Sequence, residues 1–277
     1  MGTHPDSNIH PEATGLAKTT VDKHQEEQPL KLYAGWFFQR VWLALEEKKI
    51  PYQYIEVNPY NKPASLLELN PRGLVPTLSC PQSDGSPNKP LYESNVVVEY
   101  LDEAYPDHGP RLLPTDPYQK ARTKIWIDFV TTRLLPSFYR WLQCENDNSE
   151  GGRLRETRNE LQDNLKKFTA EMDPKGPFFN GEVFGMVDFT FAPWLARFEL
   201  YEGLKEGGMG IPAPGEGGED EEVWGRWRVW SEAVKGRKSL RETLSEDQYY
   251  LPMAKRYADN VAQSEMAKAM RAGKGVP

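Results

Sequence analysis

Residues 70–78, Asn-Pro-Arg-Gly-Leu-Val-Pro-Thr-Leu, hold the first candidate for chemistry. Pro76 stands where a strand should begin, and a proline there cannot donate a hydrogen bond to a strand ladder. If the Val75–Pro76 bond is cis, Val75 turns its backbone N–H and C=O away from the sheet, where they can pair with an extended peptide ligand. Only about 5% of X-Pro bonds in folded proteins are cis. On these residues alone, the favoured interpretation is a trans proline that opens an edge strand.

Thiol and metal chemistry have few candidates in this chain. The two cysteines, Cys80 and Cys144, lie far apart and form neither a disulfide framework nor a metal cluster. The three histidines in the first 29 residues lack the spacing of a metal site. No Cys, Ser or Thr lies between Leu30 and Ser65. We therefore predict no metal site and two reduced thiols, as in a cytosolic protein.

The elements that must position the candidate residues begin near residue 30. An alternating segment, an amphipathic helix and a second alternating segment predict a right-handed strand–helix–strand unit. A short helix, two further strands and a helix that begins at Ser94 complete the pattern. The predicted elements lie at about residues 30–34, 41–49, 52–57, 64–69, 75–79, 91–92 and 94–105. Residues 30–105 therefore predict a β-α-β-α-β-β-α layer.

The rest of the chain divides into a tail, a linker and a helical region. Residues 1–29 are polar and are interpreted as a disordered tail. Residues 106–116 are rich in proline and are interpreted as a linker. Residues 117–277 predict only helices, the first of them long and kinked at Pro136.

Charge and hydropathy exclude some classes of protein. The formal net charge is −7 and the pI is about 5.3, which argues against nucleic acid as a partner, because phosphate binding needs a basic face. No apolar run approaches the roughly 18 residues of a transmembrane helix, so we expect no membrane partner. The N-terminus does not resemble a secretory signal. These features together predict a cytoplasmic protein.

Several short motifs occur in an order and spacing that resemble a known family. They are Asn61-Lys62-Pro63, residues 70–78, Tyr92-Glu93-Ser94, Leu112-Leu113-Pro114 and Met186-Val187-Asp188-Phe189. Together they resemble the cytosolic glutathione transferases, and most closely the omega class and its fungal omega-like relatives. The resemblance implies an α+β protein with an N-terminal thioredoxin-like domain followed by an all-α helical-bundle domain. It also implies glutathione as substrate or cosubstrate, and a homodimer.

The resemblance assigns a glutathione-binding site to five residues. It supports a cis Val75–Pro76 bond, with Val75 as the backbone partner of glutathione. Ser94 and the free N–H groups of its helix suit the γ-glutamyl carboxylate, and Glu93 suits the γ-glutamyl ammonium. Lys62 matches the family lysine near the glycine end. A surface lysine without a ligand remains an equal alternative for Lys62.

The catalytic corner departs from the family pattern. Omega-type enzymes have Phe-Cys-Pro-Phe, two residues and Arg, whereas this chain has Tyr-Ala-Gly-Trp-Phe-Phe-Gln-Arg at residues 33–40. A three-residue deletion explains this better than replacement of Cys-Pro by Gly35-Trp36. Without the cysteine, thiol–disulfide exchange through the protein is disfavoured. Tyr33 is the only hydroxyl near the corner and a weak catalytic candidate, because its alternation also fits core packing.

An acceptor site is expected beside this corner. Its predicted rim is the aromatic run Trp36, Phe37 and Phe38. The predicted opposite wall comes from the long helix and the C-terminal region, with candidates Phe129, Arg133, Tyr139, Trp141, Tyr249 and Tyr250.

Three functions are compatible with the sequence. The first is a glutathione transferase that acts on a hydrophobic electrophile, by conjugation or by glutathione-dependent isomerisation or elimination, in detoxification or secondary metabolism. The second is a catalytically silent glutathione- or ligand-binding protein. The third, an omega-type thioltransferase or dehydroascorbate reductase, is disfavoured by the missing cysteine.

Overall fold

The computed structural model describes residues 6–7, 9–146 and 152–272. Parts of the predicted tail, an internal stretch of the helical region (147–151) and its C-terminal end (273–277) therefore lie outside the described residues. Within the described part, no helix is both long enough and apolar enough to cross a membrane.

Contacts between Cα atoms divide the chain into two compact units. The first, here called the sheet unit, comprises His10–Leu113 and Gly236–Glu246. The second, here called the helical unit, comprises Met1–Ile9, Pro114–Lys235 and Asp247–Pro277.

The sheet unit contains a four-stranded sheet with the strand order β2-β1-β3-β4. Strand β1 pairs in parallel with β2 and antiparallel with β3, and β3 pairs antiparallel with β4. The strands are β1 (Lys31–Ala34), β2 (Gln53–Glu56), β3 (Thr77–Cys80) and β4 (Lys89–Leu91). The helices between and after them are α2 (Arg40–Lys48), α3 (Ala64–Leu69) and α4 (Ser94–Ala104). The predicted β-α-β-α-β-β-α order is confirmed.

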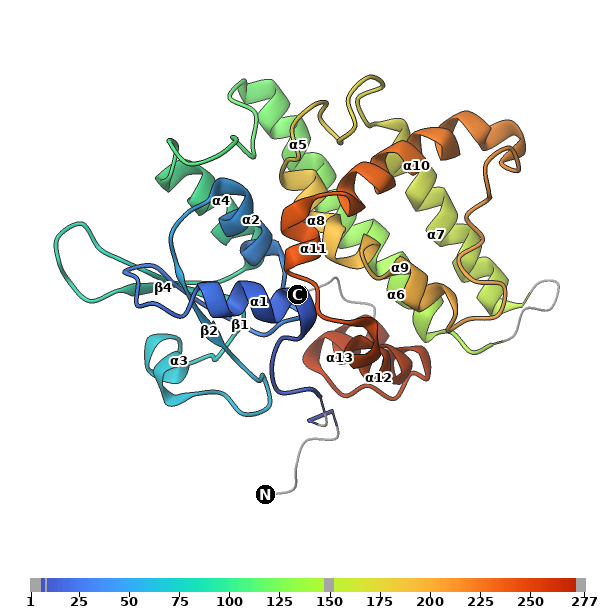
Figure 1. Ribbon diagram of the computed structural model, residues 1–277. Helices are drawn as coiled ribbons and strands as arrows, with labels where there is room; N and C mark the ends of the chain where they lie inside the picture. Colours follow the sequence, from blue (N-terminus) through green and yellow to red (C-terminus); the bar gives the residue numbers. More distant parts are fainter. Residues whose placement is uncertain (1–5, 8, 147–151, 273–277) are drawn as a thin grey trace. The chain divides into compact units, whose positions relative to one another are not determined.

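The two faces of this sheet are covered by different helices (Figure 1). Helix α3 covers one face, where Leu66 packs into a cluster with Tyr33 and Val57. Helices α2 and α4 pack together on the other face, where the ring of Trp42 lies 4.6 Å from that of Tyr54. This is the thioredoxin-like arrangement, and it explains why the side chains of β1 are buried on both faces.

The disordered tail predicted for residues 1–29 is wrong for residues 10–29. Helix α1 (Gly15–Lys23) is ordered and belongs to the sheet unit. Ala17, Thr20 and Val21 of this helix are buried, and their spacing follows one helix face, while Ala13 is buried just before the helix. The segment is polar overall, so its composition hid this narrow buried stripe.

A second distant segment also belongs to the sheet unit. Helix α11 (Lys238–Glu242) lies in Gly236–Glu246, within the region predicted to be part of the helical domain. Glu47 of α2 anchors it by accepting hydrogen bonds from Arg237 and Ser239. The prediction of a single all-helical domain over residues 117–277 is therefore wrong for the segment Gly236–Glu246.

A buried ion pair lies where the first segment of the sheet unit, His10–Leu113, ends. Lys48 and Asp102 are 0% and 1% exposed, and their charged atoms lie 3.0 Å apart. Asp102 also accepts the backbone N–H groups of Leu112 and Leu113 at 2.9 and 3.1 Å. A buried charge is tolerated only when it is paired and hydrogen-bonded, and Asp102 meets both conditions. Its bonds to Leu112 and Leu113 hold the end of the proline-rich stretch in place.

In the part that the structure describes, the regular elements of the helical unit are helices, with one isolated β-bridge between Phe178 and Gly181. Its elements are α5 (Pro117–Phe129), η1 (Val130–Leu134), α6 (Leu135–Gln143), α7 (Arg153–Ala170), α8 (Met186–Leu195), α9 (Phe198–Glu202), η2 (Gly218–Asp220), α10 (Glu221–Lys235), α12 (Asp247–Ala258) and α13 (Glu265–Arg271). The kink predicted at Pro136 corresponds to η1, a π-helical turn in which Leu135 N–H bonds to Val130 O. Proline has no N–H for the regular ladder, so the preceding turn widens.

A buried carboxylate organises the centre of the helical unit. Asp188 in α8 accepts the backbone N–H groups of Phe179 and Gly185 at 3.0 and 2.9 Å, and the Trp230 indole N–H at 2.7 Å. Burial raises the pKa of Asp188 to about 6 in spite of these donors. Asp188 therefore has a structural role, and it joins α8 to α10.

Removing the Asp102 charge should destabilise the sheet unit strongly. In Asp102→Asn, Lys48 stays buried without a counter-charge, and we expect the free energy of unfolding to fall by about 3–5 kcal/mol. Urea unfolding followed by circular dichroism measures this change. Asp107→Asn, at an exposed position, is the matched control and should change stability by less than about 0.5 kcal/mol. A loss of under about 1 kcal/mol in Asp102→Asn would contradict the assignment.

Candidate functional site

The Val75–Pro76 peptide bond is cis. This agrees with the family resemblance and not with the interpretation favoured by the isolated residues. Val75 and Pro76 directly precede Thr77, which opens β3 and lies opposite Tyr33 of β1. The Val75 side chain packs against the cluster of Tyr33, Val57 and Leu66, so its position is fixed from the α3 face.

The start of α4 lies beside the same end of β3. Leu78 of β3 pairs with Leu91 of β4, so the two strands carry residues 75–77 and 92–94 to neighbouring positions. Glu93 is exposed and has a φ of 69°, in the left-handed region that non-glycine residues rarely adopt. Such a conformation costs about 1–3 kcal/mol and is enriched at ligand sites. Ser94, the first residue of α4, follows it.

Arg40 is a site residue that the sequence analysis did not assign. It is the first residue of α2, and its guanidinium Nη1 donates to Ser94 Oγ at 3.2 Å. The N-termini of α2 and α4 therefore lie together, with a cation and a hydroxyl between them. The sequence placed Arg40 at the end of the corner motif, but its pairing with Ser94 depends on the packing of α2 on α4.

Lys62 lies across the loop that leads to Val75. A Cβ atom built on Gly73 would lie 2.9 Å from Lys62 Cδ and 3.1 Å from its Nζ. Gly73 has a φ of +59°, so glycine is required there for both conformation and space. On the other side of the loop, the Arg72 guanidinium lies 5.3 Å from the centre of the Tyr92 ring. The loop that carries Val75 thus contacts Lys62 through Gly73, and it contacts Tyr92, the residue before Glu93–Ser94, through Arg72.

The corner between β1 and α2 is a short turn. Phe38 N–H bonds to Gly35 O at 2.9 Å, and α2 begins two residues later at Arg40. A Cβ atom on Gly35 would lie 2.8 Å from Val57 O, so the turn packs directly on the end of β2. Gln39 is buried and donates to Thr243 O at 2.9 Å, which ties the turn to the segment Gly236–Glu246.

The aromatic rim is partly buried. Trp36 is only 2% exposed, and its indole N–H donates to His10 O at 3.0 Å. Phe37 and Phe38 are half-buried, with ring centres 4.5 Å apart. The prediction that all three aromatic side chains form an open rim is therefore corrected for Trp36, which is buried and packs edge-on against Phe37.

Tyr33 is a core residue. It is 6% exposed and packs with Val57 and Leu66 on the α3 face of the sheet. Helix α2 packs on the opposite face with α4. The structure therefore gives Tyr33 a packing role in place of the weak catalytic role suggested by the sequence.

Three acceptor candidates of the helical unit are also buried. Trp141 and Tyr250 are 0% and 1% exposed. The Arg197 guanidinium carbon lies 4.1 Å from the centre of the Tyr250 ring. Tyr139 accepts a hydrogen bond from the Trp194 indole at 3.0 Å. The prediction that these side chains line an open site is corrected, because their spacing reflects core packing. Tyr249 is half-buried.

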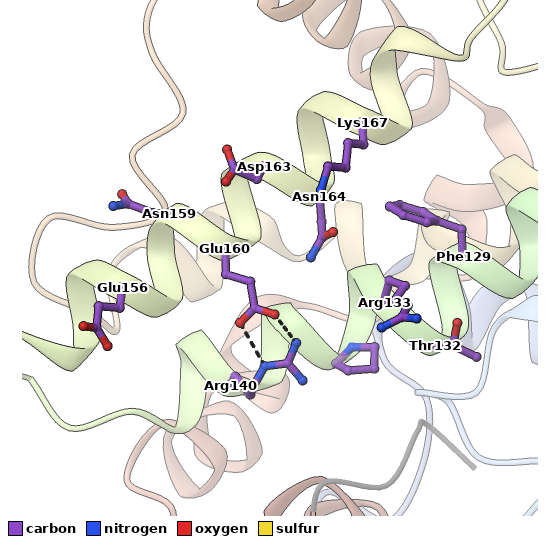
Figure 2. A pocket seen from close by; sticks show the side chains of 11 residues that line it. Phe129, Thr132, Arg133, Arg140, Glu156, Asn159, Glu160, Asp163, Asn164 and Lys167 are labelled. Carbon is purple, nitrogen blue, oxygen red and sulfur yellow. Dashed lines mark hydrogen bonds and ion pairs between the residues drawn. The ribbon is translucent and has the colours of Figure 1, made fainter.

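Phe129 and Arg133 line an open groove of about 820 Å³ between α7 and the α5–η1–α6 rod (Figure 2). Figure 2 shows the ring of Phe129 pointing into this groove near Arg133, and Arg140 paired with Glu160 further along, with Nε and Oε2 3.0 Å apart. Apart from Pro136, the other lining residues are polar: Thr132, Glu156, Asn159, Asp163, Asn164 and Lys167. This polar lining does not suit the hydrophobic acceptor for which Phe129 and Arg133 were candidates.

The two cysteines are buried and unpaired. Burial raises the pKa of the Cys80 thiol to about 11, so it is protonated at neutral pH. In the part of the chain that the structure describes, no three imidazoles, thiols or carboxylates gather as metal ligands.

Together, the sheet unit with its cis-proline and the helical unit define a thioredoxin-like protein with a helical second domain. The family model "Glutathione S-transferase, N-terminal domain" matches residues 36–104, and "Glutathione S-transferase, C-terminal domain" matches residues 152–233. The chain belongs to the glutathione S-transferase family. It is accordingly a glutathione transferase, and glutathione is its substrate or cosubstrate.

Known relatives come from more than one class. Glutathione S-transferase omega-1 of Sus scrofa is 37% identical over 60% of this chain and 64% of its own length. Glutathione S-transferase U24 of Arabidopsis thaliana is 30% identical over 79% of this chain and 89% of its own length. Among solved structures, glutathione transferase Omega 3C of Trametes versicolor is 38% identical, with a TM-score of 0.69 over 85% of this chain and 97% of that one. The omega-like character predicted from the motifs is confirmed.

The burial of both cysteines predicts a protein without an accessible thiol. At pH 8, Ellman's reagent should titrate fewer than about 0.2 thiols per native chain, because buried protonated thiols react slowly. After unfolding in guanidinium chloride, both cysteines should react, which provides the internal control. Stoichiometric labelling of the native chain would contradict this assignment.

Proposed function

We propose that this transferase joins the glutathione thiol to a hydrophobic electrophile, or uses the thiol transiently in an isomerisation or elimination, without a protein cysteine as nucleophile. The observation that carries the proposal is the corner at residues 33–40, which lacks Cys, Ser and Thr, while Cys80 and Cys144 are buried elsewhere. In conjugation, the glutathione sulfur loses its proton to water and forms a C–S bond with the electrophile. A leaving group then departs, or the addition product gains a proton.

The geometry of the sheet unit supports a glutathione site made of the five predicted residues and the neighbouring Arg40. The five are Lys62, Val75, Pro76, Glu93 and Ser94. Val75, held before the cis-Pro76, offers backbone N–H and C=O groups to the extended tripeptide. Ser94 and the first N–H groups of α4 receive the γ-glutamyl carboxylate, and Glu93 receives the ammonium. Lys62 pairs with the glycine carboxylate. Arg40 holds the Ser94 hydroxyl in place and adds positive charge.

Activation of the sulfur has no side-chain candidate at the corner. Gln39 is tied to Thr243 and Tyr33 is in the core. The N-terminus of α2 follows the turn, and its free N–H groups and dipole favour a thiolate. We infer that backbone donors lower the pKa of the bound thiol. The half-buried Phe37 and Phe38 offer apolar surface to the acceptor.

A catalytically silent binding protein is the alternative function. The observation that favours it is the same absence of a side-chain acid, base or nucleophile at the corner. An omega-type thioltransferase or dehydroascorbate reductase is disfavoured, because that chemistry needs an accessible cysteine thiolate.

We further propose a homodimer that works in the cytoplasm in detoxification or secondary metabolism. The support for a dimer is the family resemblance. The support for the cytoplasm is the pair of buried, unbridged cysteines, which suits a reducing compartment.

Glutathione binding tests the five-residue site. Glu93→Ala and Ser94→Ala should each raise the glutathione Kd about 10- to 100-fold, because each removes a hydrogen bond to a charged group worth about 1.5–3 kcal/mol. Isothermal titration calorimetry measures the change. Glu103→Ala, at an exposed position near the other end of α4, is the matched control and should leave the Kd within about twofold. Wild-type affinity in both site variants would refute the site.

The pKa of the bound thiol separates enzyme from binding protein. If α2 activates the sulfur, the glutathione thiol should titrate at least one pH unit lower when bound, because the dipole and N–H donors stabilise the thiolate. Ultraviolet absorbance of the thiolate, followed against pH, measures this pKa. S-methylglutathione, which has no titrating thiol, is the control. An unshifted pKa with tight binding would favour the silent binding protein.

A further inference from the structure

Residues 10–14 lie against the corner between β1 and α2. The Trp36 indole donates to His10 O at 3.0 Å, and Ala13 N–H donates to Glu56 Oε2 at 3.1 Å. Ala13 is 3% exposed and Trp36 is 2% exposed. This stretch, here called the strap, is therefore packed on the corner and is not a free tail.

Glu56 lies at the point where the strap meets the corner. It ends β2 and pairs with Ala34, the last residue of β1. Parallel strands end at the same edge of a sheet, so the Glu56 carboxylate lies beside Gly35 and Trp36. Within the described residues, the second oxygen of this carboxylate is buried without a hydrogen-bond partner. Glu56 thus binds the strap directly next to the turn.

The far end of the strap is anchored independently. Thr14 N–H donates to Ser245 Oγ at 3.1 Å, and Glu246 N–H donates to Thr14 Oγ1 at 3.2 Å. In the next turn, Ala17 N–H bonds to Leu244 O at 3.3 Å. The strap is therefore held both at the corner and on the segment Gly236–Glu246, which belongs to the same unit.

The strap reaches the aromatic surface through Trp36. The Trp36 ring packs edge-on against Phe37, with centres 5.3 Å apart, and Phe37 packs against Phe38 at 4.5 Å. Trp36 is buried, whereas Phe37 and Phe38 are half-buried. A strap that holds the indole therefore holds the ring against which Phe37 packs, and through Phe37 it also positions Phe38.

We propose that the strap selects apolar aromatic electrophiles for the acceptor site by fixing Trp36 against Phe37, against which Phe38 packs. His10, Ala13 and Glu56 are positioning residues in this arrangement, since they act through Trp36. The inference rests on the proposed function, in which the acceptor meets glutathione at this corner. A small polar electrophile needs no aromatic surface and should be insensitive to the strap.

The strap contact depends on pH. Burial is the main cause that raises the pKa of Glu56 to about 7, and Glu12 adds to it, while the N–H groups of Ala13 and Trp36 and the charge of Lys18 oppose it. When the strap detaches, water reaches Glu56 and its pKa returns towards 4.5. The attached state therefore binds the proton more tightly, and attachment weakens as the pH rises from about 4.5 to about 7. The full effect is on the order of a hundredfold in the attachment equilibrium.

Two substitutions test the strap at its separate anchors. Trp36→Phe keeps a ring and removes the N–H donor to His10, whereas Ser245→Ala weakens the far anchor without changing the corner. Each should raise the KM for benzyl isothiocyanate about three- to tenfold, and leave the glutathione Kd and the KM for iodoacetamide within about twofold. Ser231→Ala, in the helical unit, is the matched serine control and should change none of these values.

Hydrogen exchange gives a readout independent of catalysis. In the wild type, the amides of His10 and of residues 12–14 should exchange more slowly at pH 5.5 than at pH 7.5, after correction for the intrinsic rates, and Glu56→Gln should abolish this difference. Equal protection at both pH values, together with an unchanged benzyl isothiocyanate KM in Trp36→Phe and Ser245→Ala, would overturn the proposal. Failure of wild-type chain to bind glutathione would overturn the proposed function instead, and the exchange result would still decide the strap.

Discussion

The pairing of β3 on both of its edges is the constraint on which the candidate site depends. Because β1 and β4 both bond to β3, the loop before Thr77 is carried between the corner at Gly35 and the start of α4 at Ser94. A slip of one residue in either ladder would turn Val75 away from the cluster with Leu66. The backbone offered to a peptide ligand is therefore positioned by strand register and by core packing.

Buried carboxylates in this chain divide into two kinds. Asp102 and Asp188 are fully buried, and each accepts several hydrogen bonds. Such groups hold segments together and have no capacity left for a ligand. Glu56 is less buried, has one buried oxygen without a partner among the described residues, and ends its strand at the functional corner. This difference is why the proton on Glu56 is the one we connect to function.

The corner bears on which of two glutathione chemistries the proposed function can use. Thiol–disulfide exchange needs a protein cysteine, whereas conjugation needs only a bound, ionised glutathione and an acceptor nearby. Backbone N–H groups remain at the start of α2 whatever side chains precede it. A turn without a cysteine, packed on Val57 O and bonded to the strap through Trp36, is compatible with the second chemistry and not with the first.

The sequence by itself determined the order of strands and helices and the omega-like family, because periodicity and motif spacing are local properties; it also nominated Lys62, Val75, Glu93 and Ser94 for the glutathione site that we propose. Only the tertiary structure decided which aromatic residues are core, since Tyr139, Trp141 and Tyr250 have the same helical spacing whether they face a ligand or a neighbouring helix. It also decided where Arg40, the strap and the segment Gly236–Glu246 lie and what they contact. These depend on contacts between positions up to 232 residues apart, which no local pattern encodes.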